Sequence, residues 1–142
     1  MNVVMDLIRM TDVQKTYKTG TVALYDVDLT ISKGEFVFIV GDSGAGKSTL
    51  IKLLLKELEP TSGKITVADT DYAKLKRRNI PKLRRSLGIV FQDFRLIENM
   101  TVYENVEFAL RVTNGPSRSI RKRVAYVLSL VRLGDKARCY PR

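Results

Sequence analysis

Residues 41–49 have the types and spacing of a phosphate-binding loop. The stretch fits the pattern G-x-x-x-x-G-K-[ST]. Its glycines let backbone N–H groups point inward, and the N-terminus of a following helix directs its positive end toward a phosphate chain. The alternative is a glycine turn that binds nothing. We predict a nucleotide site formed by Gly41, Asp42, Ser43, Gly44, Ala45, Gly46, Lys47, Ser48 and Thr49.

Each polar side chain of this loop has an expected role. Lys47 supplies a mobile positive charge for the outer phosphates. The Ser48 hydroxyl is the expected Mg²⁺ ligand, because a hard cation prefers an oxygen donor, and Thr49 can donate to an inner phosphate. Asp42 is an unusual neighbour, since its carboxylate repels phosphate unless it points outward.

Two residues outside the loop are further candidates. Tyr17 precedes the turn Gly20-Thr-Val22 and could stack on a flat base, although a surface tyrosine covering a sheet edge is an equally good interpretation. Gln92 follows the apolar stretch Ile89-Val-Phe91, at a strand end where ligand-facing residues of parallel sheets gather. Neither residue identifies a reaction by itself.

Composition excludes several classes of site. The 142 residues contain no histidine and one cysteine, Cys139. Serine–histidine and cysteine–histidine nucleophiles, an internal disulfide and the usual zinc and copper sites are therefore excluded. No apolar run reaches the roughly 18–20 residues of a membrane span, and the first residues do not resemble a secretory signal. We expect the chain to stay in the cytoplasm.

The net charge of +10 is concentrated in the second half. Residues 1–73 carry a net −2 and residues 74–142 a net +12. Such a surface can contact nucleic acid or an anionic membrane, or can simply be solvated. Because no aromatic side chains interleave with the cations, we favour a solvated or membrane-facing surface over nucleic acid. The densest run contains seven cations and no acid: Lys74, Lys76, Arg77, Arg78, Lys82, Arg84 and Arg85.

Apolar periodicity predicts the elements around the loop. Residues 23–31 alternate as a half-buried strand, and an apolar stretch around residues 4–13 can pair with it. Residues 36–40 are apolar on both faces, which predicts a buried parallel strand leading into the loop. Helical spacing from Leu50 to Leu58 predicts a helix, with Lys52 and Lys56 on its polar side, that stops before Pro60 and Gly63.

The later elements are short. Pro81 near the start of residues 79–86 predicts a helix, and residues 89–91 predict a second short buried strand. Thr101 and Glu104 form a capping-box pattern that opens another helix. A last helix over residues 118–131 presents Ile120, Val124, Val127, Leu128 and Val131 on one face. The fold class is therefore α/β.

Taken together, these motifs resemble the first half of an ABC-type nucleotide-binding domain, and more narrowly its bacterial cell-division branch. They are Tyr17, residues 41–49, Val90-Phe-Gln-Asp-Phe-Arg-Leu96 and Thr101-Val-Tyr-Glu-Asn-Val106. The resemblance covers nearly the whole chain. It implies an incomplete domain: a P-loop NTPase core with a parallel sheet and an N-terminal antiparallel β element over residues 1–99, and the start of a helical subdomain over residues 100–142.

The resemblance also implies the ligands. ATP and Mg²⁺ would be the cofactors, with Tyr17 and Val22 at the adenine and residues 41–49 at the phosphates. Gln92 would be the Q-loop glutamine, which senses the γ-phosphate, and Ser48 and Gln92 would face the metal. Asp42 stands where the family usually has proline.

The implied partners are a second nucleotide-binding domain, giving a homodimer, and an integral membrane protein contacted through residues 94–103. The complex would lie at the cytoplasmic face of the cell membrane, peripherally attached, and would control cell-wall hydrolases in cell division. Related exporters of the lipoprotein-release or peptide type share most of these segments and are the alternative.

The family's signature motif, Walker B acids and switch histidine are not found in these 142 residues. Hydrolysis needs groups that orient water and stabilise charge, so we assign no catalytic residue and expect no ATP hydrolysis by this chain alone. We also expect instability, because apolar helix faces would be uncovered. A small P-loop kinase is less consistent, since more than thirty residues precede the loop. A truncated chain that acts only as an interaction module is the other alternative.

Overall fold

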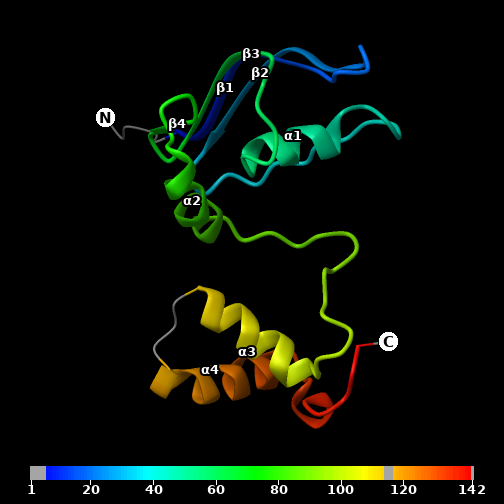
Figure 1. The fold of residues 1–142 in the computed structure, drawn as a ribbon, viewed down its shortest axis with the longest axis vertical. Coiled ribbons are helices and arrows are strands. Elements are labelled where there is room, and N and C mark those ends of the chain that lie inside the picture. The colour runs from blue at the N-terminus through cyan, green and yellow to red at the C-terminus, as the bar shows by residue number, and fades with distance from the viewer. Residues whose placement is uncertain (1–5, 114–116, 142) are drawn as a thin grey trace. The chain divides into compact units, whose positions relative to one another are not determined.

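The computed structural model describes residues 6–113 and 117–141, and the chain divides into two compact units (Figure 1). The N-terminal unit is Met1–Leu87 and the C-terminal unit is Gly88–Arg142. The predicted boundary between residues 99 and 100 concerns the family's subdomains and stays a prediction.

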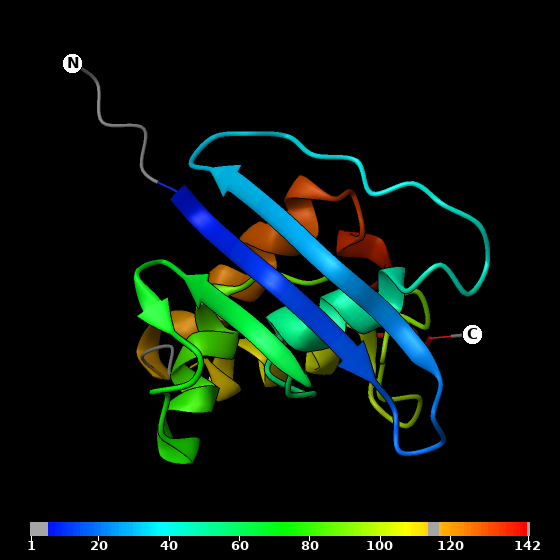
Figure 2. The same ribbon diagram turned by 90° about the horizontal axis from the view of Figure 1, so that it is seen from above.

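A four-stranded antiparallel sheet forms the base of the N-terminal unit (Figure 2). The strands are β1 (Asp6–Thr16), β2 (Val22–Ser32), β3 (Ser62–Val67) and β4 (Thr70–Asp71), in the order β2-β1-β3-β4. Met10 of β1 stands opposite Leu29 of β2 and Ile65 of β3. The predicted pairing of the first two strands is confirmed.

One face of this sheet is covered by α1 (Lys47–Leu54). Leu50 and Leu53 of the helix pack with Met10, Val13 and Ile65 of the sheet. These side chains expose 7% of their surface or less, so the helix that follows the glycine loop is fixed by apolar burial.

The same core receives a side chain from the predicted short helix. This helix is α2 (Ile80–Ser86), which follows a 3₁₀ turn, η1 (Arg77–Asn79), and contributes the buried Leu83. The prediction of this helix is confirmed. The sequence analysis missed β3, although the β-branched run Ile65-Thr-Val67 was a signal for a strand.

Helix α1 ends at Leu54, short of the predicted Leu58. Side chains from outside the helix bind the carbonyls at its end: the Tyr72 hydroxyl donates to Leu54 O, and Arg84 Nε donates to Leu55 O over 2.9 Å. Lys56 then adopts φ +54°, a left-handed conformation that ends the helix.

Two predicted buried strands, residues 36–40 and 89–91, are not formed, and these predictions are wrong for this chain. Phe36, Phe38 and Val40 expose 81%, 79% and 86% of their surface, and Val90 exposes 90%. A buried parallel strand needs hydrogen-bonded neighbours. Within residues 6–113 and 117–141, the four strands pair only with their neighbours in the order β2-β1-β3-β4. None of these strands pairs with residues 36–40 or 89–91.

The C-terminal unit is a helical hairpin of α3 (Val102–Val112) and α4 (Ser117–Leu130), followed by the 3₁₀ turn η2 (Gly134–Lys136). The predicted capping box is confirmed: Glu104 N donates to Thr101 Oγ1, and Thr101 N donates to Glu104 Oε2 over 2.7 Å. The bonds from Thr101 hold the pKa of the Glu104 carboxyl below its usual value.

The buried face of α4 is narrower than predicted. Ile120, Val124 and Leu128 are buried against α3, whereas Val127 and Val131 are exposed. Helix α3 covers only the row of α4 side chains that lie four residues apart. Among the described residues, no helix combines the length and the apolar character needed to cross a bilayer.

Candidate nucleotide-binding site

The loop of residues 41–46 has the backbone of an anion-binding turn. Gly41, Gly44 and Gly46 adopt φ of +153°, +87° and +87°, which side chains disfavour. Gly46 is the N-cap residue of α1, and no side chain caps this helix. The first N–H groups of α1 are therefore left for a ligand at the loop.

Strand β2 fixes the position of the loop through Gly46. A Cβ atom on Gly46 would lie 2.4 Å from Ala23 O and 2.8 Å from Leu24 Cδ2. Gly44 has the same φ, but a Cβ atom there would meet nothing within 4 Å. Gly46 is thus required both for its conformation and for close contact with the sheet, and Gly44 for its conformation alone.

Lys47 is held within the loop. Its Nζ donates to Gly41 O and, over 2.7 Å, to Asp42 O. Asp42 O also accepts from Ala45 N at 3.1 Å, while the Asp42 side chain is exposed. The ammonium group therefore lies beside the glycine turn, where its hydrogen bonds to these carbonyls can be replaced by hydrogen bonds to phosphate oxygens.

Tyr17 lies beside the first turn of α1. Its hydroxyl is 3.0 Å from Thr49 Oγ1, and the residue is half-buried. Val22, at the start of β2, exposes 59% of its surface. The structure thus brings together the predicted aromatic of the β1–β2 turn and the predicted phosphate ligand Thr49.

The remaining predicted site residues, Ser48 and Gln92, belong to different units. Ser48 is exposed in the first turn of α1. Gln92 is exposed in the C-terminal unit and is followed by two residues with positive φ, Phe94 and Arg95. That Gln92 and Ser48 share a metal ion stays a prediction.

A buried lysine supports the end of α1, and the sequence analysis had placed it on the polar side. Lys56 Nζ donates to Tyr72 O over 2.8 Å and pairs with Glu59 Oε2 at 2.5 Å. Burial raises the pKa of Tyr72 to about 12. Helical periodicity could not predict the burial of Lys56, because this residue lies beyond the last turn of α1.

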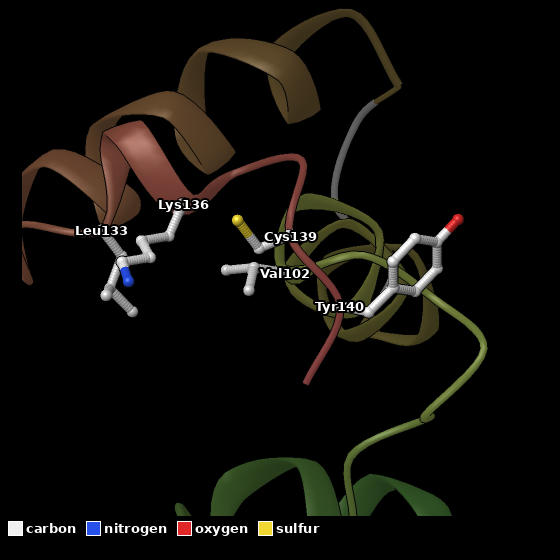
Figure 3. A pocket seen from close by; sticks show the side chains of 5 residues that line it. All are labelled: Val102, Leu133, Lys136, Cys139 and Tyr140. Carbon is white, nitrogen blue, oxygen red and sulfur yellow. The ribbon is translucent and has the colours of Figure 1, made fainter. Parts of the chain in front are cut away.

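A separate cavity of about 480 Å³ lies in the C-terminal unit (Figure 3). Leu133 and Lys136 line one side of it and Tyr140 the other, with Val102 and Cys139 between them. The segment that contains Cys139 also caps α3, because Val102 N, in the first turn of α3, donates to Cys139 O over 2.8 Å. None of the predicted nucleotide ligands lines this cavity.

Comparison with known proteins decides the family. The ABC transporter family model matches residues 24–141, a range that includes the glycine loop, α1 and Gln92. The chain belongs to the ABC transporter family. The predicted resemblance is thereby confirmed.

Curated members of this ABC family are similar over nearly the whole chain. The cell division ATP-binding protein FtsE of Bacillus subtilis is 49% identical over 135 residues, which is 95% of this chain and 59% of that protein. FtsE of Streptococcus pneumoniae strain D39 is 46% identical, over 96% of this chain and 60% of its own length. The methionine import ATP-binding protein MetN of Helicobacter hepaticus is 38% identical, over 95% of this chain and 38% of its length. This chain therefore spans less than two thirds of these relatives.

Solved ABC structures confirm the fold class. The ATP-binding cassette MJ0796, in a dimeric post-hydrolysis state bound to ADP and Pi, has a TM-score of 0.83 and 35% identity, covering 94% of this chain and 61% of its own. The cbiO1 protein of Clostridium perfringens, part of the ABC transporter complex cbiONQ, has a TM-score of 0.81 and 33% identity, covering 96% and 54%. The chain has the fold of part of an ABC ATPase cassette.

Proposed function

We propose that this chain is the ATP-binding portion of an FtsE-like ABC ATPase in bacterial cell division. The observation that carries the proposal is the loop of residues 41–49, in which an uncapped helix N-terminus, glycines at positive φ and the Lys47 ammonium converge. Identity of 49% to one FtsE and 46% to another supports the cell-division branch.

The residues present fit a nucleoside triphosphate with Mg²⁺. The free N–H groups at the start of α1 would bind phosphate oxygens, and Lys47 would exchange Gly41 O and Asp42 O for the outer phosphates. Ser48 would hold the Mg²⁺ ion, which neutralises charge on the phosphates. The Tyr17 ring would stack on adenine, close to Thr49 at the inner phosphate.

Turnover would require groups beyond these 142 residues. Hydrolysis of ATP needs a residue that orients water and charges that stabilise the transition state. We assign no such residue among positions 1–142 and propose that this chain alone binds ATP without hydrolysing it.

The partners follow from the same proposal. The complete protein would form a homodimer of nucleotide-binding domains and attach peripherally to an integral membrane protein resembling FtsX, at the cytoplasmic face of the cell membrane. Nucleotide-driven closure of the dimer would then control cell-wall hydrolases through that partner.

Replacing Lys47 tests the nucleotide site. Fluorescence titration with a fluorescent ATP analogue and Mg²⁺ should show binding by the wild-type chain and a loss of at least about tenfold in Lys47→Ala, because a charge-assisted contact is removed. Lys52→Ala, an exposed lysine on the same helix, should stay within about twofold. Equal affinities of the two variants would contradict the proposal.

A phosphate-release assay tests the second half of the proposal. The wild-type chain with Mg²⁺ and ATP should release phosphate no faster than Lys47→Ala does. Turnover that is present in the wild type and lost in this variant would show that the chain contains its own catalytic groups.

A further inference from the structure

A surface of six cations on the N-terminal unit has no role in the fold or the nucleotide site. This basic surface extends from the end of β4 through η1 to α2. Within the described residues, none of the six forms an ion pair or side-chain hydrogen bond, and no acid lies in residues 74–85. The basic surface consists of the exposed residues Lys74, Lys76, Arg77, Arg78, Lys82 and Arg85.

The seventh cation of the run shows what a structural role would look like. Arg84 turns toward α1, where its Nε and Nη2 donate to Leu55 O and Lys56 O over 2.9 and 3.2 Å. Lys82 and Arg85 are three residues apart in α2 and form one stripe, and Leu83 is buried on another side. Arg78 lies in the preceding turn η1. The stripe faces water, and its like charges repel one another unless an anionic partner neutralises them.

A groove beside this stripe adds hydrogen-bond donors. The cavity, of about 340 Å³, lies between the turn into β4 and α2, which are neighbours in both ribbon views. The polar residues of its lining are Thr70, Asn79, Lys82 and Ser86, and the apolar ones include Val67, Leu75 and Leu83. The hydroxyl, amide and ammonium groups that the polar residues carry suit a phosphate group.

We propose that the basic surface docks on anionic phospholipid headgroups, one of whose phosphates enters the groove beside Lys82. Nucleic acid fits less well, because residues 74–85 contain no aromatic side chain and the nearby Tyr72 is only 2% exposed, so no stacking platform exists here. The choice of a lipid surface rests on the proposed attachment to a membrane partner.

Co-sedimentation of the purified 142-residue chain with vesicles tests this docking. The chain should bind vesicles of phosphatidylcholine and phosphatidylglycerol in equal parts, and not vesicles of phosphatidylcholine alone. The triple variant Lys76→Gln, Arg78→Gln, Lys82→Gln should bind the anionic vesicles about a hundredfold more weakly, since each basic residue near an anionic bilayer contributes about fivefold. Binding by the wild type should also fall with added salt.

A matched control separates the basic surface from net charge. The triple variant Arg121→Gln, Lys122→Gln, Arg123→Gln loses three exposed cations of α4 and should bind vesicles about as the wild type does. Equal losses in both triple variants, or no preference for anionic vesicles, would overturn the proposal. The proposal would also be overturned if the wild type bound duplex DNA more tightly than vesicles at the same salt concentration and the first triple variant lost this DNA binding.

The ATP titration distinguishes this proposal from the nucleotide site. The first triple variant should bind the ATP analogue as the wild type does, because none of its three side chains is hydrogen-bonded to residues 41–49. Loss of vesicle binding with ATP binding intact supports the lipid proposal, whereas a wild-type chain that binds vesicles but no ATP contradicts the proposed function alone.

Discussion

Two apolar segments, both predicted to be strands, differ in the structure of this chain. Residues 23–31 become part of β2, hydrogen-bonded to β1, and bury Leu24 to 8% exposure. Residues 36–40 are at least as apolar but form no strand and expose Phe38 to 79%. An apolar pattern thus indicates which segment favours burial. A strand forms only where a neighbouring strand hydrogen-bonds to its backbone. The glycine loop is therefore held by β2 on one side and follows an unpaired segment on the other.

Truncating one apolar side chain in the core and one in residues 36–40 should have very different effects on stability. Leu53→Ala, in the core under the sheet, should lower the free energy of unfolding by about 3 kcal/mol, because it leaves a cavity. Phe38→Ala should change it by no more than about 0.5 kcal/mol. Urea denaturation followed by circular dichroism measures both. A Phe38→Ala loss as large as that of Leu53→Ala would mean that residues 36–40 are buried in solution.

Two glycines of the loop test whether β2 fixes its position. Gly46→Ala should destabilise the chain by about 2–3 kcal/mol, since its Cβ would collide with Ala23 O and its φ is positive. Gly44→Ala has the same φ without a collision and should cost about 1 kcal/mol. Urea denaturation without nucleotide measures both losses. Equal losses would show that β2 does not hold the loop.

The end of α1 is tested by alkaline pH. The pKa of Tyr72 is about 12 in the folded chain and about 10 when exposed, so folding favours the neutral phenol. Its contribution to stability is present below pH 10 and is lost as the pH rises through 12. Tyr72→Phe should lack this part of the pH dependence. Because lysines titrate in both proteins, the difference between the two stability curves reports Tyr72 alone. Parallel stability curves for wild type and variant between pH 10 and 12 would contradict the buried hydroxyl.

The smallest expected effect concerns the C-terminal unit, where a capping box begins α3. Thr101→Ala should destabilise that unit by about 1 kcal/mol, and Thr101→Ser should stay near the wild type, because serine keeps the capping hydroxyl. Since the pKa of Glu104 is lowered, its contribution is present above the usual pKa and is lost as the pH falls through the lowered value. Amide hydrogen exchange of residues 102–112 measures the change. Equal effects of the two substitutions would argue against the cap.

Elements specified by local sequence could be predicted well. The glycine loop with its helix, the β1–β2 pair, α2 and the Thr101 capping box each depend on neighbouring residues, and the structure contains them all. The two predicted parallel strands needed neighbouring strands, and within residues 6–113 and 117–141 no strand pairs with them, so the prediction of burial failed at Phe36 and Val90. The capping of α1 by distant side chains was equally unpredictable, because Arg84 lies 29 residues from Leu55 and Tyr72 lies 18 residues from Leu54.

The candidate site was predictable to a similar extent. The loop pattern located Lys47 and Thr49, and the structure places Tyr17 against Thr49. The sequence could not show that Gly46 touches β2, because this contact joins segments more than twenty residues apart. The role of Gln92 depends on its approach to the loop and stays a prediction.

Amide hydrogen exchange of residues 41–49, with and without Mg²⁺ and ATP, tests the central claim most directly. If the loop and the start of α1 bind phosphate, their amides should become protected on addition of nucleotide, and Lys47→Ala should abolish the change. Unchanged exchange at residues 41–49 at a nucleotide concentration that protects amides elsewhere in the chain would contradict the account.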